Sequence, residues 1–207
     1  MRHFQPFQHP VLKTIAEGFL DTIPKKVFLN TNFLIFPPIF FADVPHFKNL
    51  IDSIKPWTDV DEIIIIVVHP LKWEEVSPIH IDGMTEENSA GIVFNIPILN
   101  CDESYTISYK VINQNPIVSN RQMDLEQDLR DESKKNTHPF IAYDDKDVEQ
   151  VGIVDYKNYT ANFLHTGKPH KVMNLNKKLR VLASVRWKPS ITWTEVDNFL
   201  NTNSSNK

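Results

Sequence analysis

The chain has 207 residues, 41% hydrophobic and 23% charged, which suits one domain with a sizeable core and excludes wholesale disorder. A net charge of −4 gives no general case for binding nucleic acid or an anionic membrane. Cys101 is the single cysteine, no signal peptide opens the chain, and the longest apolar run, Ile63 to Val68, is too short to span a bilayer. We therefore expect a soluble, cytoplasmic protein without an intrachain disulfide, in which Cys101 is a buried side chain rather than a nucleophile.

The N-terminal part, residues 1–60, is predicted to be a helical support. Residues 11–23 and 46–54 both place apolar side chains at helical spacing, which predicts two amphipathic helices. Between them, residues 25–41 are rich in Phe and Ile and contain adjacent prolines. This composition favours strand and irregular packing over helix.

A series of strands follows. Residues 62–68 form an unbroken β-branched run, which predicts a strand covered on both faces. Further strands are predicted at residues 76–82, 91–99 and 105–112. Pro97 predicts that its strand is either an edge strand or one that carries a bulge.

Residues 113–150 break the strand pattern. Their middle, residues 124–135, is intensely charged, and both a helix and a mobile loop fit it. A long excursion inside a β-rich domain predicts an insertion, either a lid over a site or a surface loop. Beyond it, the pattern predicts four more short strands and a closing helix, at residues 150–155, 160–165, 168–173, 180–187 and 194–200.

Together these elements predict a single domain, 1–207, of the mainly β, α+β class. About eight short strands after an N-terminal helical region are typical of a double-sheet jelly roll. Its core is expected to span residues 61–190 and to contain the insertion 113–150. Residues 191–207 would form a C-terminal helix and tail.

Four residues on the predicted strands point to metal chemistry. His80 and Asp82 are two residues apart, so on a strand they project to the same side. His170 enters a later strand, and Arg180 follows ten residues further on, across what we predict to be a hairpin. Two imidazoles and one carboxylate leave open positions on a metal, as in non-haem Fe(II) oxygenases. A guanidinium at a fixed distance from that metal can hold a carboxylate by a bidentate pair.

The order of these residues resembles that of the Fe(II)/2-oxoglutarate-dependent oxygenases: His-x-Asp, a long spacer, a distal His, then an Arg ten residues on. The likeness covers residues 60–190 and includes the run 159–170, which is similar to the family's strand–turn–strand approach to the distal histidine. It is greatest to the prolyl- and aspartyl-hydroxylase-like branch, including small proteins from phages and marine microbes. The resemblance implies a cupin-like, double-stranded β-helix that binds Fe(II), 2-oxoglutarate and O₂ and releases succinate and CO₂.

Carried over by position, the resemblance implies that His80, Asp82 and His170 are the iron ligands. Arg180 would then bind the distal carboxylate of 2-oxoglutarate. Arg186 has the same strand parity and is an alternative clamp for that carboxylate.

Some positions stay open. His165 is an alternative distal ligand, although no Arg or Lys lies ten residues after it. Leu182 stands where some branches of the family have a serine. A further cosubstrate contact is expected from the middle strands, for which Asn95, Tyr105 and Tyr109 are the candidates.

The resemblance implies hydroxylation of an unidentified substrate, with a peptidyl or amino-acid residue suggested by the branch. The expected partners are the small-molecule cosubstrate and this substrate, with no membrane, and the acidic charge balance argues mildly against nucleic acid. Two alternatives remain. A cupin-like metal-dependent hydrolase or isomerase would not need Arg180, and a non-catalytic jelly-roll binding module would need no metal.

Overall fold

The computed structural model describes residues 2–30, 33–70, 79–82, 91–113, 117–119 and 140–204. Within these ranges the fold is of the α+β class, built mainly from antiparallel strands in two six-stranded sheets. Three α-helices accompany the sheets in this part of the chain: α1 (Val11–Thr22), α2 (Phe47–Ile54) and α3 (Trp193–Ser204).

The strands divide between the two sheets in an interleaved order. The first sheet has the order β1 (Phe4–Phe7), β10 (Ala161–His165), β5 (Ile92–Leu99), β12 (Arg180–Trp187), β3 (Val60–Val68), β2 (Phe33–Phe36). The second sheet has the order β7 (Ile117–Ser119), β8 (Phe140–Tyr143), β4 (Ile79–Ile81), β11 (His170–Asn174), β6 (Ser104–Val111), β9 (Val148–Asp155). Strands close in sequence, such as β4 and β5, therefore lie in different sheets.

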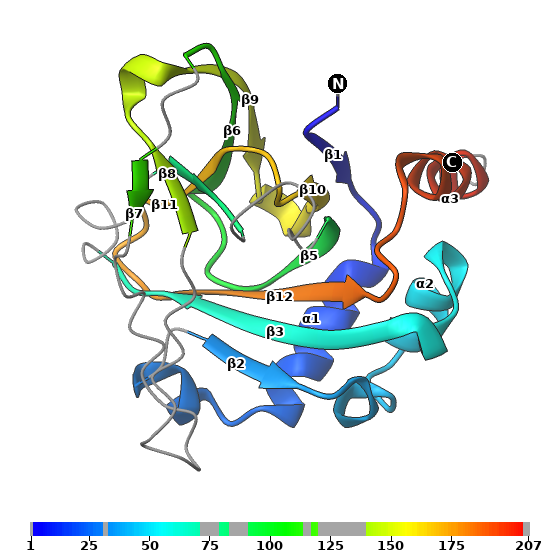
Figure 1. Cartoon of the computed structure of the whole chain (residues 1–207). Helices are drawn as coiled ribbons and strands as arrows, with labels where there is room; N and C mark the ends of the chain where they lie inside the picture. The colour runs from blue at the N-terminus through cyan, green and yellow to red at the C-terminus, as the bar shows by residue number, and fades with distance from the viewer. Residues whose placement is uncertain are drawn as a thin grey trace, which may run out of the picture.

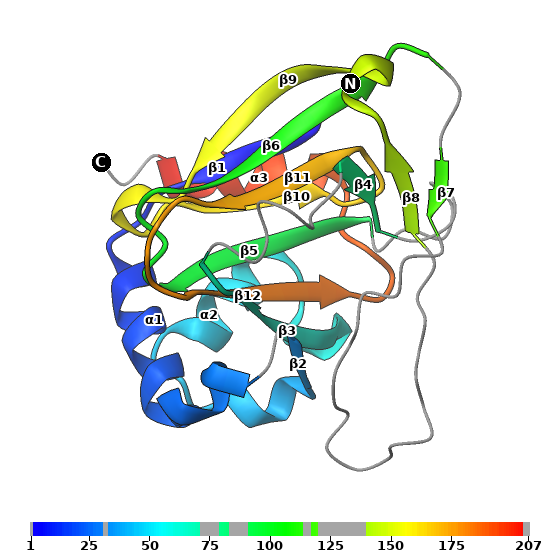
Figure 2. The same ribbon diagram turned by 90° about the vertical axis from the view of Figure 1, so that its left-hand side faces the viewer.

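The first sheet lies between helices α1 and α2 on one side and the second sheet on the other (Figures 1 and 2). The apolar stripe of α1 packs into the main core together with alternate residues of β3, including Ile63, Ile65 and Val67. The intervening residues of β3, Ile64 and Val68, are also buried. The prediction that this strand is covered on both faces is thus confirmed. Among the described residues, no helix has the length and apolar character needed to cross a membrane.

The interior between the two sheets is different in character. Among the described residues, its buried apolar cluster consists of Cys101, Val154, Tyr156 and Leu182, and other inward-facing apolar residues such as Val68 and Leu164 are buried outside that cluster. Cys101 is buried, which confirms that part of the expectation for this cysteine. Many of the remaining inward-facing positions are polar, and they are the residues from which the candidate site is built.

Several sequence predictions are corrected by the structure. The predicted hairpin between His170 and Arg180 is not formed, because β11 belongs to the second sheet and β12 to the first. Pro97 does not mark an edge, since β5 is central. The alternative prediction is confirmed, because the pairing with β12 shifts register at Leu182–Pro97.

Residues 113–150 were predicted to interrupt the series of strands, but the structure places strands within this region. β7, β8 and the start of β9 lie inside it. Residues 120–139, which include the charged segment considered as a lid, fall outside the described residues. At the N-terminus, β1 was not predicted, and residues 25–41 contain two 3-10 helices beside the short strand β2.

Candidate metal centre

The site begins with the pairing of β4 and β11 in the second sheet. His80 lies directly opposite His170 in the antiparallel register, so the two imidazoles project from the same face. Their ring centroids are 4.6 Å apart, and both side chains are buried. The distal histidine thus comes from a strand folded back beside the His80 strand, as the sequence predicted.

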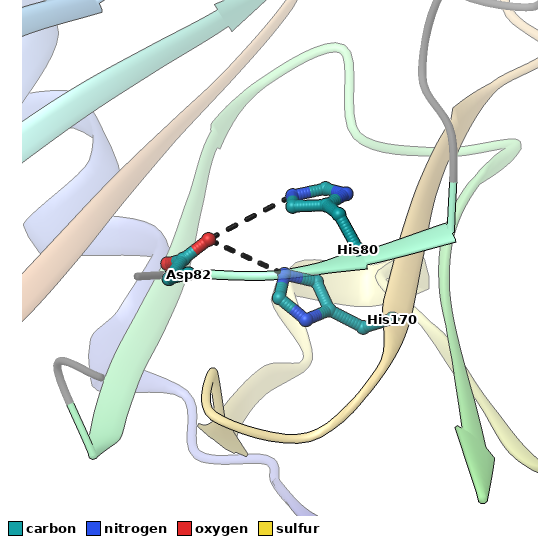
Figure 3. Close-up of side chains that lie close together, drawn as sticks. All are labelled: His80, Asp82 and His170. Atoms are coloured by element: carbon teal, nitrogen blue, oxygen red, sulfur yellow. Dashed lines mark ion pairs between the residues drawn. The ribbon is translucent and has the colours of Figure 1, made fainter. Parts of the chain in front are cut away.

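Asp82 completes a group of three potential ligands just after β4. Its Oδ1 lies 3.7 Å from His80 Nε2 and 3.9 Å from His170 Nε2. Figure 3 shows the carboxylate and the two rings pointing toward one another. The Asp82 backbone N–H donates to Thr166 O at 2.9 Å, which fixes this turn. A metal about 2.1 Å from each ligand atom needs those atoms about 3 to 4 Å apart. The two distances to Asp82 meet this requirement, and all three ligand atoms lie within 4.8 Å of one another, so the group is a candidate site for one ion.

His170 is held in the form that binds metals. Its Nδ1 lies 2.9 Å from the Lys168 carbonyl oxygen, so Nδ1 carries the proton and Nε2 keeps its lone pair. Burial, with a contribution from the nearby His80, lowers the pKa of His170 to about 4, and the Asp82 charge opposes this effect. The imidazole is therefore neutral at neutral pH, as metal binding requires.

Arg186 is already engaged by protein carboxylates. Its Nη2 lies 3.3 Å from Asp82 Oδ2, and its Nη1 lies 3.7 Å from Glu62 Oε1. Asp82 is thus oriented from both sides, with one oxygen toward the imidazoles and the other toward the guanidinium. Such a contact behind a ligand stabilises its orientation.

Arg180 has the opposite environment. Its side chain is fully buried, and Nε, Nη1 and Nη2 form no hydrogen bond to an oxygen acceptor in the described part of the chain. The guanidinium carbon lies 4.6 Å from the ring centroid of Tyr156, whose hydroxyl is 2.8 Å from Thr106 Oγ1. Burial raises the pKa of the neighbouring Cys101 thiol, and the charge of Arg180 and a side-chain hydrogen bond with it partly lower that pKa. A thiol sulfur is only a weak acceptor and carries no charge to balance the guanidinium. A buried cation of this kind is costly unless an anion joins it.

The remaining predicted positions are spread over both sheets. His165 lies on β10 in the first sheet and is not one of the three clustered ligands. Tyr105 and Tyr109 alternate with the buried residues of β6 and so lie on the outer face of the second sheet. Asn95 is buried on the inner face of β5. Of the three candidates for a further cosubstrate contact, Asn95 therefore faces the interior.

Sequence reasoning missed Asn162 on β10 and Ser108 on β6. Both are buried, and in the described residues neither Asn162 carboxamide atom nor the Ser108 hydroxyl has a hydrogen-bond partner. The available signal was a single Asn inside the apolar run Ala161 to Leu164, where a buried polar residue calls for a partner.

The chain was also compared with protein-family models and with curated proteins, and neither comparison found a match. Its function is therefore argued from the site alone.

Proposed function

We propose that the protein is an Fe(II)- and 2-oxoglutarate-dependent dioxygenase that hydroxylates a small polar or peptidyl substrate. The observation that carries this proposal is Arg180, a fully buried cation with no carboxylate partner among the described residues, in the same interior as a His–Asp–His ligand set whose two histidines are buried. A metal site alone fits many enzymes. A metal site with a buried receptor for a carboxylate fits a dicarboxylate cosubstrate.

The arrangement of strands supports a jelly-roll interpretation of the fold. The order β10-β5-β12-β3 in one sheet lies opposite β9-β6-β11-β4 in the other, and all neighbours are antiparallel. This interleaving of eight strands is expected for a double-stranded β-helix. The candidate ligands lie on the second and seventh of these strands in chain order, and both arginines lie on the eighth.

The two arginines support separate roles. Arg180 and Arg186 are six residues apart on one face of β12, so their Cα atoms are about 20 Å apart. This separation exceeds the length of a five-carbon dicarboxylate, which could extend from Arg180 toward the metal beside the apolar side chains of Leu182 and Ile66. Arg180 would anchor the distal carboxylate, while Arg186 would orient Asp82.

His80, Asp82 and His170 would hold Fe(II). When bound, the iron supplies O₂ activation: one oxygen atom enters a substrate C–H bond, and the other enters succinate as 2-oxoglutarate loses CO₂. The chain itself would bind the dicarboxylate at Arg180, keep His170 neutral and shield the two buried histidines from bulk water.

The proposal is tested by succinate release from 2-oxoglutarate with Fe(II), ascorbate and O₂. Purified protein should form succinate at a rate that His80→Ala abolishes, with pools of amino acids and peptides raising the rate further. Failure of both Fe(II) and Mn(II) to raise the melting temperature would contradict a metal site and favour a non-catalytic module. Metal-dependent turnover that survives Arg180→Leu would favour the hydrolase or isomerase alternative.

A further inference from the structure

A pair of buried carboxamides lies in the interior between the sheets. Asn95 on β5 and Asn162 on β10 are directly opposite each other in the antiparallel register. Their chain neighbours Phe94 and Phe163 belong to the core that packs under the helices. Because side chains alternate along a strand, the two carboxamides point the other way, toward the second sheet.

This pair lies in the same layer as the candidate metal ligands. Ser184 on β12 is opposite Asn95 and continues the polar row across a third strand. Arg186, which contacts Asp82, is two residues further along β12, a distance of about 7 Å. The Ser184 end of the row is therefore close to the candidate metal ligands, whereas Arg180 lies four residues away in the opposite direction along β12.

Several polar side-chain atoms of the pair have no hydrogen-bond partner in the described residues. Within the described ranges, Asn162 Nδ2, Asn162 Oδ1 and Asn95 Oδ1 have no partner, although the two side chains are only 0% and 5% exposed. Exchanging the amide nitrogen and oxygen of Asn162 leaves one open donor and one open acceptor in either case. Unpaired buried amides are unfavourable and rare in native proteins, so a bound group is expected to complete them.

The open atoms define the chemistry of that group. Because the pair presents at least one donor and one acceptor, its ligand must offer both. 2-Oxoglutarate carries only acceptor oxygens at neutral pH, and an ammonium carries only donors. A neutral carboxamide carries an N–H₂ donor and a C=O acceptor in one plane and can match Asn162 at both atoms.

We propose that the Asn95–Asn162 pair binds a carboxamide of the substrate, so that the enzyme acts on asparagine or glutamine, free or within a peptide. This assignment of substrate class rests on the proposed oxygenase function for the reaction itself. The recognition step needs only hydrogen bonds, and the neutral pair selects against the acidic isosteres aspartate and glutamate.

The experiment measures binding in the protein loaded with Mn(II) and 2-oxoglutarate, so that no turnover occurs. The probes are L-asparagine, L-glutamine and blocked tripeptides containing either residue, each compared with its aspartate or glutamate counterpart and with adenosine. We expect at least one carboxamide probe to bind at least about tenfold more tightly than its acidic isostere, by calorimetry. Equal binding of the two, or binding of adenosine alone, would overturn the inference.

Variants of Asn162 separate recognition from structure. Asn162→Leu should lose about tenfold or more in carboxamide affinity, keep its affinity for Mn(II) and 2-oxoglutarate, and melt no lower than the wild type, because it removes an unpaired amide. Asn162→Asp should lower the affinity for the carboxamide probes to a similar extent. The exposed Asn201→Leu on α3 is the matched control and should change none of these quantities.

The outcomes distinguish failure of the carboxamide assignment from failure of the proposed function. If the wild-type protein fails to bind Mn(II) or 2-oxoglutarate, the proposed function is wrong, and this inference is wrong with it. Normal loading without any carboxamide binding would leave the oxygenase proposal intact and show that the Asn pair holds buried water only. A large fall in the melting temperature of Asn162→Leu, with carboxamide affinity unchanged, would make Asn162 a structural residue.

Discussion

At the scale of single residues, Arg180 and Arg186 carry the same charge on the same strand face but have different partners. Arg186 contacts two protein carboxylates, whereas the guanidinium nitrogens of Arg180 contact none in the described residues. The alternative that Arg186 clamps the cosubstrate would require it to release Asp82 first. The sequence could not show which arginine binds the cosubstrate, because both project from the same face of β12. The contacts that distinguish them come from other strands.

The two arginines should respond oppositely to replacement. We expect Arg180→Leu to abolish the 2-oxoglutarate-dependent rise in melting temperature while Mn(II) still binds, because it removes the carboxylate receptor and leaves the metal ligands in place. Arg186→Leu should weaken Mn(II) binding by about 10- to 100-fold, since the orientation of Asp82 is lost. Titration calorimetry of each variant with Mn(II) and then 2-oxoglutarate measures both effects. The reverse pattern would assign the cosubstrate to Arg186.

His170 confers a defined acid sensitivity on the metal-free protein. Its pKa of about 4 in the folded state lies below the ordinary histidine value of 6.5, so the unfolded chain binds more protons between these values. The free energy of unfolding should therefore fall as the pH drops from 6.5 toward 4, by about 3 kcal/mol at most. Urea denaturation with a chelator present should show this slope, and His170→Gln should flatten it. Equal slopes in both proteins would show that protonation of His170 is not the cause.

At the scale of elements, the sequence predicted most strands but not how they are distributed between sheets. β-branched runs and alternation locate β3, β5, β6 and β12, because these signals are local. The division into two sheets, the change of sheet between β11 and β12, and the short edge strand β1 all depend on contacts distant in sequence. His80, Asp82 and His170 were predictable as a group only because a known spacing pattern supplied that long-range information.

The edge strand β1 depends on a glycine in the second sheet. A Cβ built on Gly152 of β9 would lie 2.2 Å from Cε1 of Phe4, so the ring occupies the space a side chain would need. We expect Gly152→Ala to destabilise the fold by roughly 1–3 kcal/mol, because Phe4 must move away from the inter-sheet core. The double variant Gly152→Ala/Phe4→Leu should recover part of this loss in urea denaturation. Additive effects of the two substitutions would show that the ring is not the cause.

At the scale of the whole molecule, the two halves of the protein have unequal cores. The first sheet and the helices share a large apolar core. In the described residues, the space between the sheets holds a smaller apolar set beside its polar row: the cluster of Cys101, Val154, Tyr156 and Leu182, with further buried side chains such as Val68, Val93 and Leu164. Hydrophobic burial therefore stabilises the first sheet far more than the second. The candidate metal site joins the central strands β4 and β11 of the second sheet, so a bound metal would add stability there.

Metal binding should therefore stabilise the second sheet in particular. Without metal, amides of β4, β11 and β6 should exchange with solvent faster than those of β3, β5 and β12, because the second sheet opens without global unfolding. Mn(II) at a hundred times its dissociation constant should add about 2.7 kcal/mol to the stability of any state that retains the site. Hydrogen exchange read by mass spectrometry should show this gain in peptides from β4 and β11, and His80→Ala should abolish it. Uniform protection of both sheets on adding metal would instead show that the two sheets open together as one cooperative unit.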